Sequence, residues 1–347
     1  MCVTWKRLVF ILLAAAISSR AAAQEAPAAS SDGLLLEVAI ASSLDGQRQS
    51  VRYWAPPLAR EQPTPLFVFL HSWSSDYRQD CTPWWKEASQ RNWIYLQPDF
   101  RGPNNRPEAC GSPLARQDVL DAIDWASANY KVDRSRIYLA GASGGGHMAM
   151  LMAGRHPDRF SAVSAWVGIS DLAEWQRFHS QGGKPGRYAE MVVASCGGIP
   201  DASATVAEQY RERSPIHWLQ NVGDLPLDLA AGVHDGKKGS VPIAHTLRAF
   251  NVVATTRGAA TVSEVEMEQL QSNARLSLPQ TEDQVTDTAY GRNIHLRRSA
   301  GSTRVTIFEG GHEGLAAAGC EWLAQQRRTT STSRAPKSEA AGAQRAP

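Results

Sequence analysis

The sequence predicts an α/β fold, a mostly parallel, twisted sheet of about eight strands flanked by helices. Two observations support this. Short apolar runs bounded by proline, glycine or polar residues recur along the chain, as is typical of strands buried on both faces of a parallel sheet. Stretches with apolar residues at helical spacing lie between several of these runs, and alternation of strand and helix indicates parallel strands joined by crossover helices.

The individual elements follow in order along the chain. Residues 34–40 and 50–55 flank the turn signal Asp45-Gly46, which predicts an opening hairpin. Residues 115–130 carry apolar side chains at helical spacing and predict a helix. A second helix is expected to begin near Gly145. Further apolar runs predict buried strands at 65–70, 93–98, 136–141, 160–170, 225–233 and 304–311.

The chain is expected to hold one folded domain between two segments of other kinds. Residues 1–23 have a basic start, a short apolar centre and small residues at the end, which predicts a signal peptide. Residues 24–326 form the domain, with a segment at 171–222 long enough to be a lid and a polar insertion at about 255–300. Residues 327–347 contain no large apolar side chain and predict a disordered tail.

Composition excludes several functional classes. Of 347 residues, 43% are hydrophobic and 20% charged, and the net charge is +2, so no basic surface for nucleic acid is indicated. After the signal peptide, no apolar run is long enough to span a bilayer. No metal or nucleotide motif is present, so no cofactor is expected. A secreted or periplasmic location follows from the signal peptide.

A serine in a glycine-rich turn is the strongest functional signal. The stretch GASGGG places Ser143 between the predicted strand 136–141 and the predicted helix, with Gly141 and Gly145 two residues to either side. This G-x-S-x-G pattern is typical of a nucleophile on a sharp strand-to-helix turn. Asp235 and His312 each follow a later predicted strand. Serine, acid and histidine in this order are the arrangement of α/β hydrolases.

Other residues could take parts of this role. Asp201, Asp224 and Asp228 are alternative acids, and Asp228 is the poorest fit because it lies within a predicted strand. His147, His234 and His295 are alternative bases, but none of them follows a predicted strand as His312 does.

An oxyanion hole is expected next to the serine, because acyl transfer needs two backbone donors for the developing negative charge. Gly144, the residue after Ser143, should supply one, and either Ser72 or Trp73 in the loop after strand 65–70 the other. We expect His71, at the end of that strand, to shape the loop.

Residues 60–320 resemble the catalytic domain of the prolyl oligopeptidase family. The similar stretches are QPDFRG, GASGGGHMAM, the SDLAEW segment, the stretch ending in SPIHW, AGVHD and GGH. The resemblance implies a serine hydrolase with the triad Ser143, Asp235 and His312. The chain departs from the family pattern by a short insertion at 237–240. The family's peptidases carry a propeller ahead of this domain, and the roughly 40 residues before the sheet leave no room for one, which favours an esterase.

The substrate is expected to be a carboxylic ester of carbohydrate or a similar extracellular small molecule or polysaccharide. Trp84, Trp85 and Trp175 lie near the proposed site in sequence and could stack on sugar or aromatic acyl groups. A serine peptidase is the alternative activity. A non-catalytic binding protein on the same scaffold is a third.

Four cysteines remain after the signal peptide, and an even number in an exported chain suggests two disulfides. Since Cys81 and Cys110 follow neighbouring strands, we expect Cys81–Cys110, which leaves Cys196–Cys320. Buried free thiols are the alternative.

Overall fold

The computed structural model describes residues 34–329, in which nine strands form one sheet with the order β1-β2-β4-β3-β5-β6-β7-β9-β8. Antiparallel pairing is confined to β1 with β2, β2 with β4, and β8 with β9, and the other neighbours run parallel. The strands are β1 (Leu36–Ala41), β2 (Arg48–Trp54), β3 (Thr64–Leu70), β4 (Ile94–Pro98), β5 (Val132–Ala142), β6 (Ala162–Trp166), β7 (Leu227–Gly232), β8 (Ile294–Ala300) and β9 (Thr303–Phe308).

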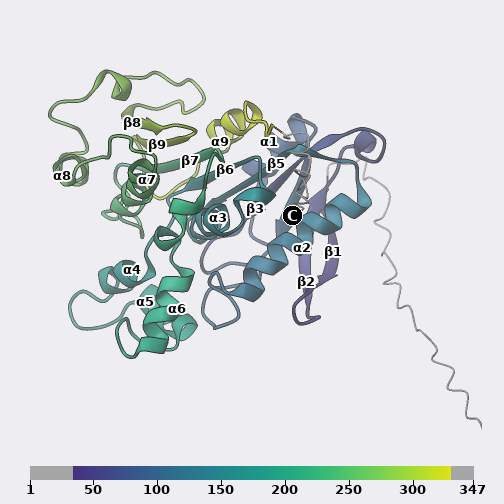
Figure 1. Ribbon diagram of the computed structural model, residues 1–347, viewed down its shortest axis with the longest axis horizontal. Coiled ribbons are helices and arrows are strands. Elements are labelled where there is room, and N and C mark those ends of the chain that lie inside the picture. The colour runs from purple at the N-terminus through teal and green to yellow at the C-terminus, as the bar shows by residue number, and fades with distance from the viewer. Residues whose placement is uncertain (1–33, 330–347) are drawn as a thin grey trace, which may run out of the picture.

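Helices cover both faces of the sheet. Helices α2, α3 and α7 pack on one face, and α1 and α9 contact each other on the opposite face (Figure 1). Helices α4, α5 and α6 lie between β6 and β7 in sequence and pack on one another. The helices are α1 (Thr82–Gln90), α2 (Pro113–Asn129), α3 (Gly144–Arg155), α4 (Leu172–Phe178), α5 (Arg187–Cys196), α6 (Ala204–Arg213), α7 (Ala244–Thr256), α8 (Glu264–Asn273) and α9 (Ala316–Ala324).

Burial explains why the apolar runs became central strands. Every residue of β3, β4, β6 and β7 is buried, so these strands have no polar face. At the edges, no residue of β1 is fully buried, and the second half of β8 alternates between buried and more exposed positions. The architecture confirms the expected α/β-hydrolase fold.

Strand β8 is a strand that the sequence interpretation missed, and it lies inside the expected polar insertion 255–300. Its residues include two arginines. Arg297 donates to Asp287 at 3.0 Å and Arg298 forms an ion pair with Asp283, so both charges are balanced at the sheet edge. The polar composition therefore reflects an edge strand with paired charges.

The end of the folded body also differs from the expected boundary at 326. The backbone N–H of Arg328 donates to the carbonyl of Ser135 at 3.0 Å, so the chain remains attached to the domain beyond that point. The predicted signal peptide and nearly all of the predicted tail lie outside the described residues.

Two groups of buried apolar side chains make up the interior. The larger fills the space between the sheet and its helices. The smaller joins α4–α6 to the loops after β3 and β4, and it includes Trp73, Cys110, Trp175 and Cys196. The segment expected as a lid forms three helices that contribute to this smaller core, and we call it the α4–α6 insertion.

The four cysteines are buried free thiols, which corrects the expected pairs Cys81–Cys110 and Cys196–Cys320. Both expected pairs would join the two cores, since Cys81 and Cys320 lie in the larger core and Cys110 and Cys196 in the smaller one. Burial raises the pKa of Cys81 to about 12 and that of Cys110 to about 11, so both remain protonated near neutral pH.

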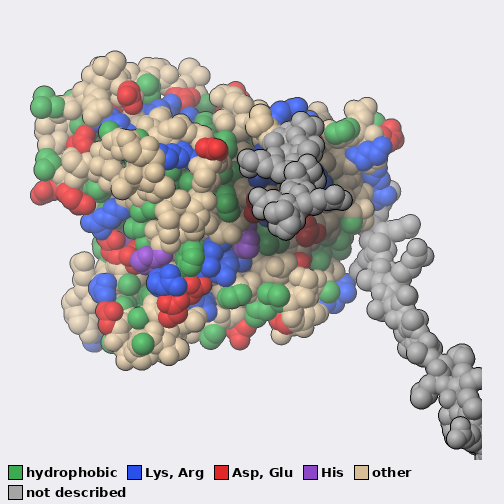
Figure 2. Space-filling model, viewed as in Figure 1, with side chains coloured by type: hydrophobic (Ala, Val, Ile, Leu, Met, Phe, Trp, Pro, Cys, Tyr) green, Lys and Arg blue, Asp and Glu red, His purple; other side chains and the backbone are tan. Residues whose placement is uncertain are grey.

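The surface shows no broad region of one charge sign on the face in Figure 2, where basic and acidic side chains are interspersed. Within residues 34–329, no helix is both long enough and apolar enough to cross a membrane.

Candidate active site

Ser143 lies at the sharp turn from β5 into α3, with φ 59° and ψ −120°. Small residues around it are required by close backbone packing. A Cβ on Gly141 would lie 2.3 Å from the carbonyl oxygen of Gly145, and one on Gly145 would lie 2.1 Å from that of Leu70. The strained turn directs Ser143 away from the helix interior, as expected from the G-x-S-x-G pattern.

The three residues expected as a triad converge. The Ser143 hydroxyl lies 2.8 Å from Nε2 of His312, and Nδ1 of His312 lies 2.7 Å from Oδ2 of Asp235. Asp235 follows β7 and His312 follows β9, and these parallel strands end at the same edge of the sheet as β5. The arrangement lets His312 accept the serine proton while Asp235 fixes the imidazole tautomer.

The carboxylate of Asp235 is held by its own loop. The side chain is buried, and Oδ1 accepts the backbone N–H groups of Gly236 at 2.9 Å and Val241 at 3.1 Å. The loop returns so closely that a Cβ on Gly239 would lie 2.1 Å from Oδ1 of Asp235. Both carboxylate oxygens are therefore occupied, one by the loop and one by His312.

A fourth side chain at the site was not found from the sequence. The hydroxyl of Ser240 lies 3.2 Å from Nε2 of His312. Ser240 lies in the segment 237–240, which is interpreted from the sequence as a short insertion. The sequence alone could not show that these residues turn back toward His312.

The backbone amides expected to form the oxyanion hole lie side by side. A Cβ on Gly144 would lie 2.3 Å from the backbone nitrogen of Trp73, so the two residues are packed together. Of the two residues considered in the loop, Ser72 is the wrong one, because its N–H donates to Oε1 of Gln79 at 2.7 Å. The N–H groups of Trp73 and Gly144 make no hydrogen bond within the described residues.

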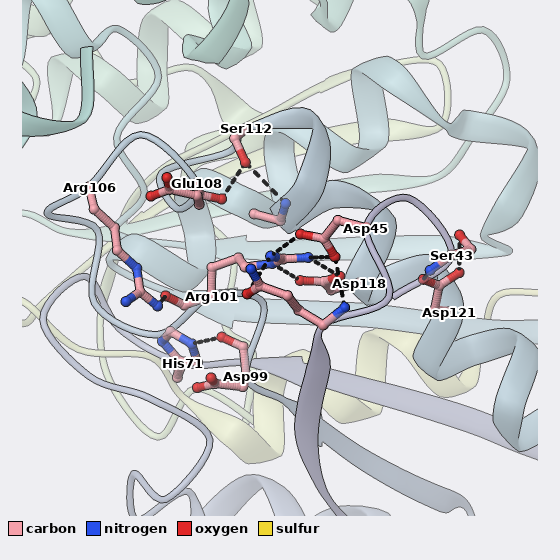
Figure 3. A network of polar contacts seen from close by, with 12 residues as sticks. Ser43, Asp45, His71, Asp99, Arg101, Arg106, Glu108, Ser112, Asp118 and Asp121 are labelled. Atoms are coloured by element: carbon pink, nitrogen blue, oxygen red, sulfur yellow. Dashed lines mark hydrogen bonds and ion pairs between the residues drawn. The ribbon is translucent and has the colours of Figure 1, made fainter. Parts of the chain in front are cut away.

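A buried polar network supports the loop that carries Trp73 (Figure 3). His71 stacks on Phe100 with ring centroids 3.9 Å apart, and its Nε2 donates to the carbonyl of Asp99 at 2.7 Å. Burial lowers the pKa of His71, which keeps the ring neutral. His71 thus shapes the loop, as expected.

The same network continues through Arg101 in the QPDFRG motif. Arg101 is 2% exposed, and its guanidinium bonds to Asp118 of α2 and to Asp45 in the turn between β1 and β2 (Figure 3). These contacts therefore attach the loop after β4 to helix α2 and to the turn between β1 and β2.

A cavity of about 500 Å³ opens beside Ser143 and His312. Its aromatic lining includes Phe69, Trp73 and Trp84, all of them buried, and Tyr188 of α5 contributes from the α4–α6 insertion. Its polar lining comes from Ser72, Ser74, Ser75, Gln79, Asp80 and Glu313.

The other two tryptophans expected at the substrate lie elsewhere, so that expectation is corrected. Trp85 packs against the larger core. Trp175 is 1% exposed within the smaller core, where its indole N–H donates to the carbonyl of Ser240 at 2.8 Å. The sequence showed how near these residues are to the site along the chain but not which way their helices face.

The alternative acids considered from the sequence do not contact His312, because each is exposed or bonded to another side chain. Asp228 is fully buried, and it accepts from Ser164 at 2.7 Å and from Arg304 at 2.7 Å. Asp201 forms an exposed ion pair with Arg177, and Asp224 is exposed.

The alternative bases are also used elsewhere. His234 and His295 both contact the carboxylate of Glu309, at 2.8 and 2.9 Å. His147 donates to the carbonyl of Arg213 at 2.7 Å.

Comparison with known families agrees with this geometry. The profile described as the prolyl oligopeptidase family matches residues 82–269, more than half of the chain. The chain belongs to the prolyl oligopeptidase family. The relatives and solved structures that resemble this chain include proteins named as esterases and proteins named as peptidases.

Curated relatives match parts of the chain. Acetylxylan esterase A of Emericella nidulans is 25% identical over 124 residues, 36% of this chain and 32% of that protein. Acylamino-acid-releasing enzyme of Arabidopsis thaliana is 28% identical over 34% of this chain and 17% of that protein. Feruloyl esterase B of Neurospora crassa is 35% identical over 52 residues, 15% of this chain and 18% of that protein. The chain thus spans a third or less of the length of these relatives.

Solved structures share the fold. A puromycin-hydrolyzing peptidase of Mycobacterium tuberculosis superposes with a TM-score of 0.56 at 16% identity, over 83% of this chain and 38% of that one. Acylaminoacyl peptidase of Pyrococcus horikoshii superposes with a TM-score of 0.51 at 20% identity, over 65% of this chain and 35% of that one.

Proposed function

We propose that this family member is a carboxylic ester hydrolase acting through an acyl-enzyme on Ser143, with His312 as general base and Asp235 as its partner. The observation that carries the proposal is the continuous chain of contacts from Ser143 through His312 to Asp235, at 2.8 and 2.7 Å. A serine hydroxyl needs such a base to become an effective nucleophile.

The reaction proceeds in two halves. The Ser143 oxygen attacks the ester carbonyl as its proton passes to Nε2 of His312, and the N–H groups of Gly144 and Trp73 stabilise the oxyanion. The imidazolium then protonates the leaving alcohol as its bond to the acyl carbon breaks. In the second half, water attacks the acyl-enzyme, gives a proton to Nε2, and the acid departs as Ser143 recovers its proton.

The cavity and the relatives support an ester substrate. Phe69 and Trp84 are buried behind the cavity lining, whereas Tyr188 is half-buried and offers an aromatic ring on the side of Ser143, suited to a flat acyl group or a sugar ring. Two of the curated relatives are named as an acetylxylan esterase and a feruloyl esterase. The signal-peptide pattern of residues 1–23 adds that the protein acts outside the cytoplasm, on an ester of carbohydrate or a similar extracellular compound.

A substrate panel tests the ester proposal. The purified protein is assayed on nitrophenyl acetate, methyl ferulate and acetylated xylan, and in parallel on aminoacyl and Xaa-Pro nitroanilides, with Ser143→Ala as the blank. We expect kcat/KM for the best ester to exceed that for the best anilide by roughly 100-fold or more, since anilides are the harder acyl donors and depend on peptide subsites.

The second candidate is a serine peptidase, favoured by the family match and the peptidase structures that share the fold. Anilides cleaved as well as or better than every ester would establish it and overturn the ester proposal.

A further inference from the structure

The hydroxyl of Ser240 stands beside the imidazole of His312, at 3.2 Å from the same Nε2 atom that contacts Ser143 at 2.8 Å. In the neutral imidazole, Nδ1 carries the proton shared with Asp235, so Nε2 has one lone pair to offer. Two hydroxyl groups therefore lie within reach of a single acceptor. The shorter contact goes to Ser143 in the free enzyme.

Ser240 is held in place by the α4–α6 insertion. Its carbonyl accepts the indole N–H of Trp175 at 2.8 Å and the Nε2–H of His179, also at 2.8 Å. Burial lowers the pKa of His179, so the ring is neutral near pH 7 and this donor persists. The side chain of Trp175 in α4 and that of His179, the residue after α4, thus fix the backbone of a residue that contacts the catalytic base.

The residues on either side of Ser240 are tied to the triad. The N–H of Val241 donates to Oδ1 of Asp235 at 3.1 Å. At Gly239 a Cβ would lie 2.7 Å from Cβ of His312. Little freedom remains for the Ser240 side chain to leave the imidazole, because its neighbours on both sides are packed against Asp235 and His312.

We propose that Ser240 is a positioning residue for His312 that acts mainly in the hydrolysis of the acyl-enzyme. This inference rests on the proposed roles of Ser143, His312 and Asp235. Once Ser143 is acylated, its oxygen carries no proton and no longer donates to Nε2. Among residues 34–329, Ser240 is then the side chain left to donate to Nε2 and keep the ring facing the acyl group.

The Ser240 hydroxyl can also help to position the water molecule that attacks the acyl-enzyme. A hydroxyl is both donor and acceptor, so when water replaces Ser240 as the donor to Nε2, the Ser240 oxygen can accept the second hydrogen of that water. Water then attacks the acyl carbon, its proton passes to Nε2, and the bond between the acyl carbon and the Ser143 oxygen breaks as that oxygen takes the proton. Ser240 keeps its own proton throughout.

Separate measurement of the two half-reactions tests this role. With nitrophenyl acetate, rapid mixing gives the acylation rate, and intact-mass spectrometry of quenched samples follows decay of the acyl-enzyme. We expect Ser240→Ala to slow deacylation by about tenfold, the loss expected for one hydrogen bond at a charged centre. Acylation should change by less than about threefold, so kcat and KM fall together while kcat/KM stays nearly constant.

Two matched variants complete the experiment. Ser240→Thr keeps the hydroxyl and should restore deacylation to within about threefold of the parent. Ser127→Ala removes a hydroxyl that donates to the Ile123 carbonyl within α2, and it should leave both half-reactions unchanged.

Three results would overturn the proposal. Equal slowing of both half-reactions by Ser240→Ala would mean that the residue only maintains the general geometry of the site. Unchanged deacylation would mean that it has no role, and so would a Thr variant as slow as the Ala variant. Failure of the underlying mechanism looks different, because the unsubstituted protein would then form no acyl-enzyme on Ser143 at all.

Discussion

At the scale of single residues, the site depends on positions where no side chain fits. Gly144 is packed on Trp73, which places two backbone donors together, and Gly239 is packed on Asp235 and His312, which closes the loop over the triad. In both places a glycine permits an approach between backbone and catalytic group that any Cβ would prevent. The catalytic geometry is therefore specified as much by glycines as by the three reactive side chains.

Gly239→Ala tests this directly. Its Cβ would lie 2.1 Å from Oδ1 of Asp235, so the carboxylate or the loop must move, and we expect kcat/KM to fall by roughly 100-fold because a shift of about 1 Å costs that much. Gly311→Ala is the matched control, since a Cβ there meets no atom within 4 Å although the residue adjoins His312. Ester kinetics that rank the two variants equally would contradict this account.

At the scale of elements, buried ion pairs connect the loops behind the site to the sheet and its helices. Arg101, in the turn after β4, contacts Asp118 of α2 and Asp45 of the β1–β2 turn (Figure 3). The Arg101 and Asp118 side chains are 2% and 1% exposed. Removal of the Asp118 charge would leave the buried guanidinium of Arg101 paired with Asp45 alone, whose side chain is 26% exposed, so the charge of Arg101 would lose its buried partner.

Asp118→Asn should therefore lower the free energy of unfolding by about 3 kcal/mol, measured by urea titration at neutral pH. The control is Asp121→Asn on the same helix, where the carboxylate bonds to Ser43 in an exposed position and should contribute less than about 1 kcal/mol. A loss for Asp118→Asn no larger than that for Asp121→Asn would show that the buried pair does not stabilise this junction.

At the scale of the whole molecule, the α4–α6 insertion and the sheet domain are joined through buried polar contacts. His147 of α3 is fully buried and donates to the carbonyl of Arg213, at the end of α6. Burial lowers the pKa of His147 from 6.5 to about 4, because the charged ring would lose its hydration. The folded protein thus keeps this histidine neutral where the unfolded chain protonates it.

Acid should weaken the fold through this group. Between pH 6.5 and about 4 the unfolded chain binds the proton that folded His147 excludes, so its contribution to stability is present above 6.5 and is lost as the pH falls. The loss should reach about 3 kcal/mol. In His147→Gln the free energy of unfolding should fall less steeply from pH 7 to pH 4, and identical slopes for the two proteins would contradict the assignment.

The sequence could predict those features that depend on local patterns and on the order of the strands. Ser143, Asp235 and His312 could be found because each follows a strand, and parallel strands end at one edge of the sheet. The choice of Trp73 over Ser72 could not be made, because it depends on the hydrogen bond that the Ser72 N–H donates to Oε1 of Gln79. Strand β8 was not predicted, because its two arginines make the segment look polar.

The sequence also could not predict features that depend on the path of a loop or on which side of a helix a residue lies. The cysteine pairs were wrong because neighbouring loops led into two separate cores. Trp175 faces Ser240 and not the cavity, and the contact of Ser240 with His312 results from how residues 237–240 turn back.

Covalent labelling of the serine tests the central claim most directly. The protein is treated with a fluorophosphonate, digested, and the modified peptide sequenced by mass spectrometry. Because His312 makes its shorter hydroxyl contact with Ser143, the label should be found on Ser143, and it should disappear in Ser143→Ala and fall sharply in His312→Ala. A label on another residue, or catalysis that survives in Ser143→Ala, would contradict the account.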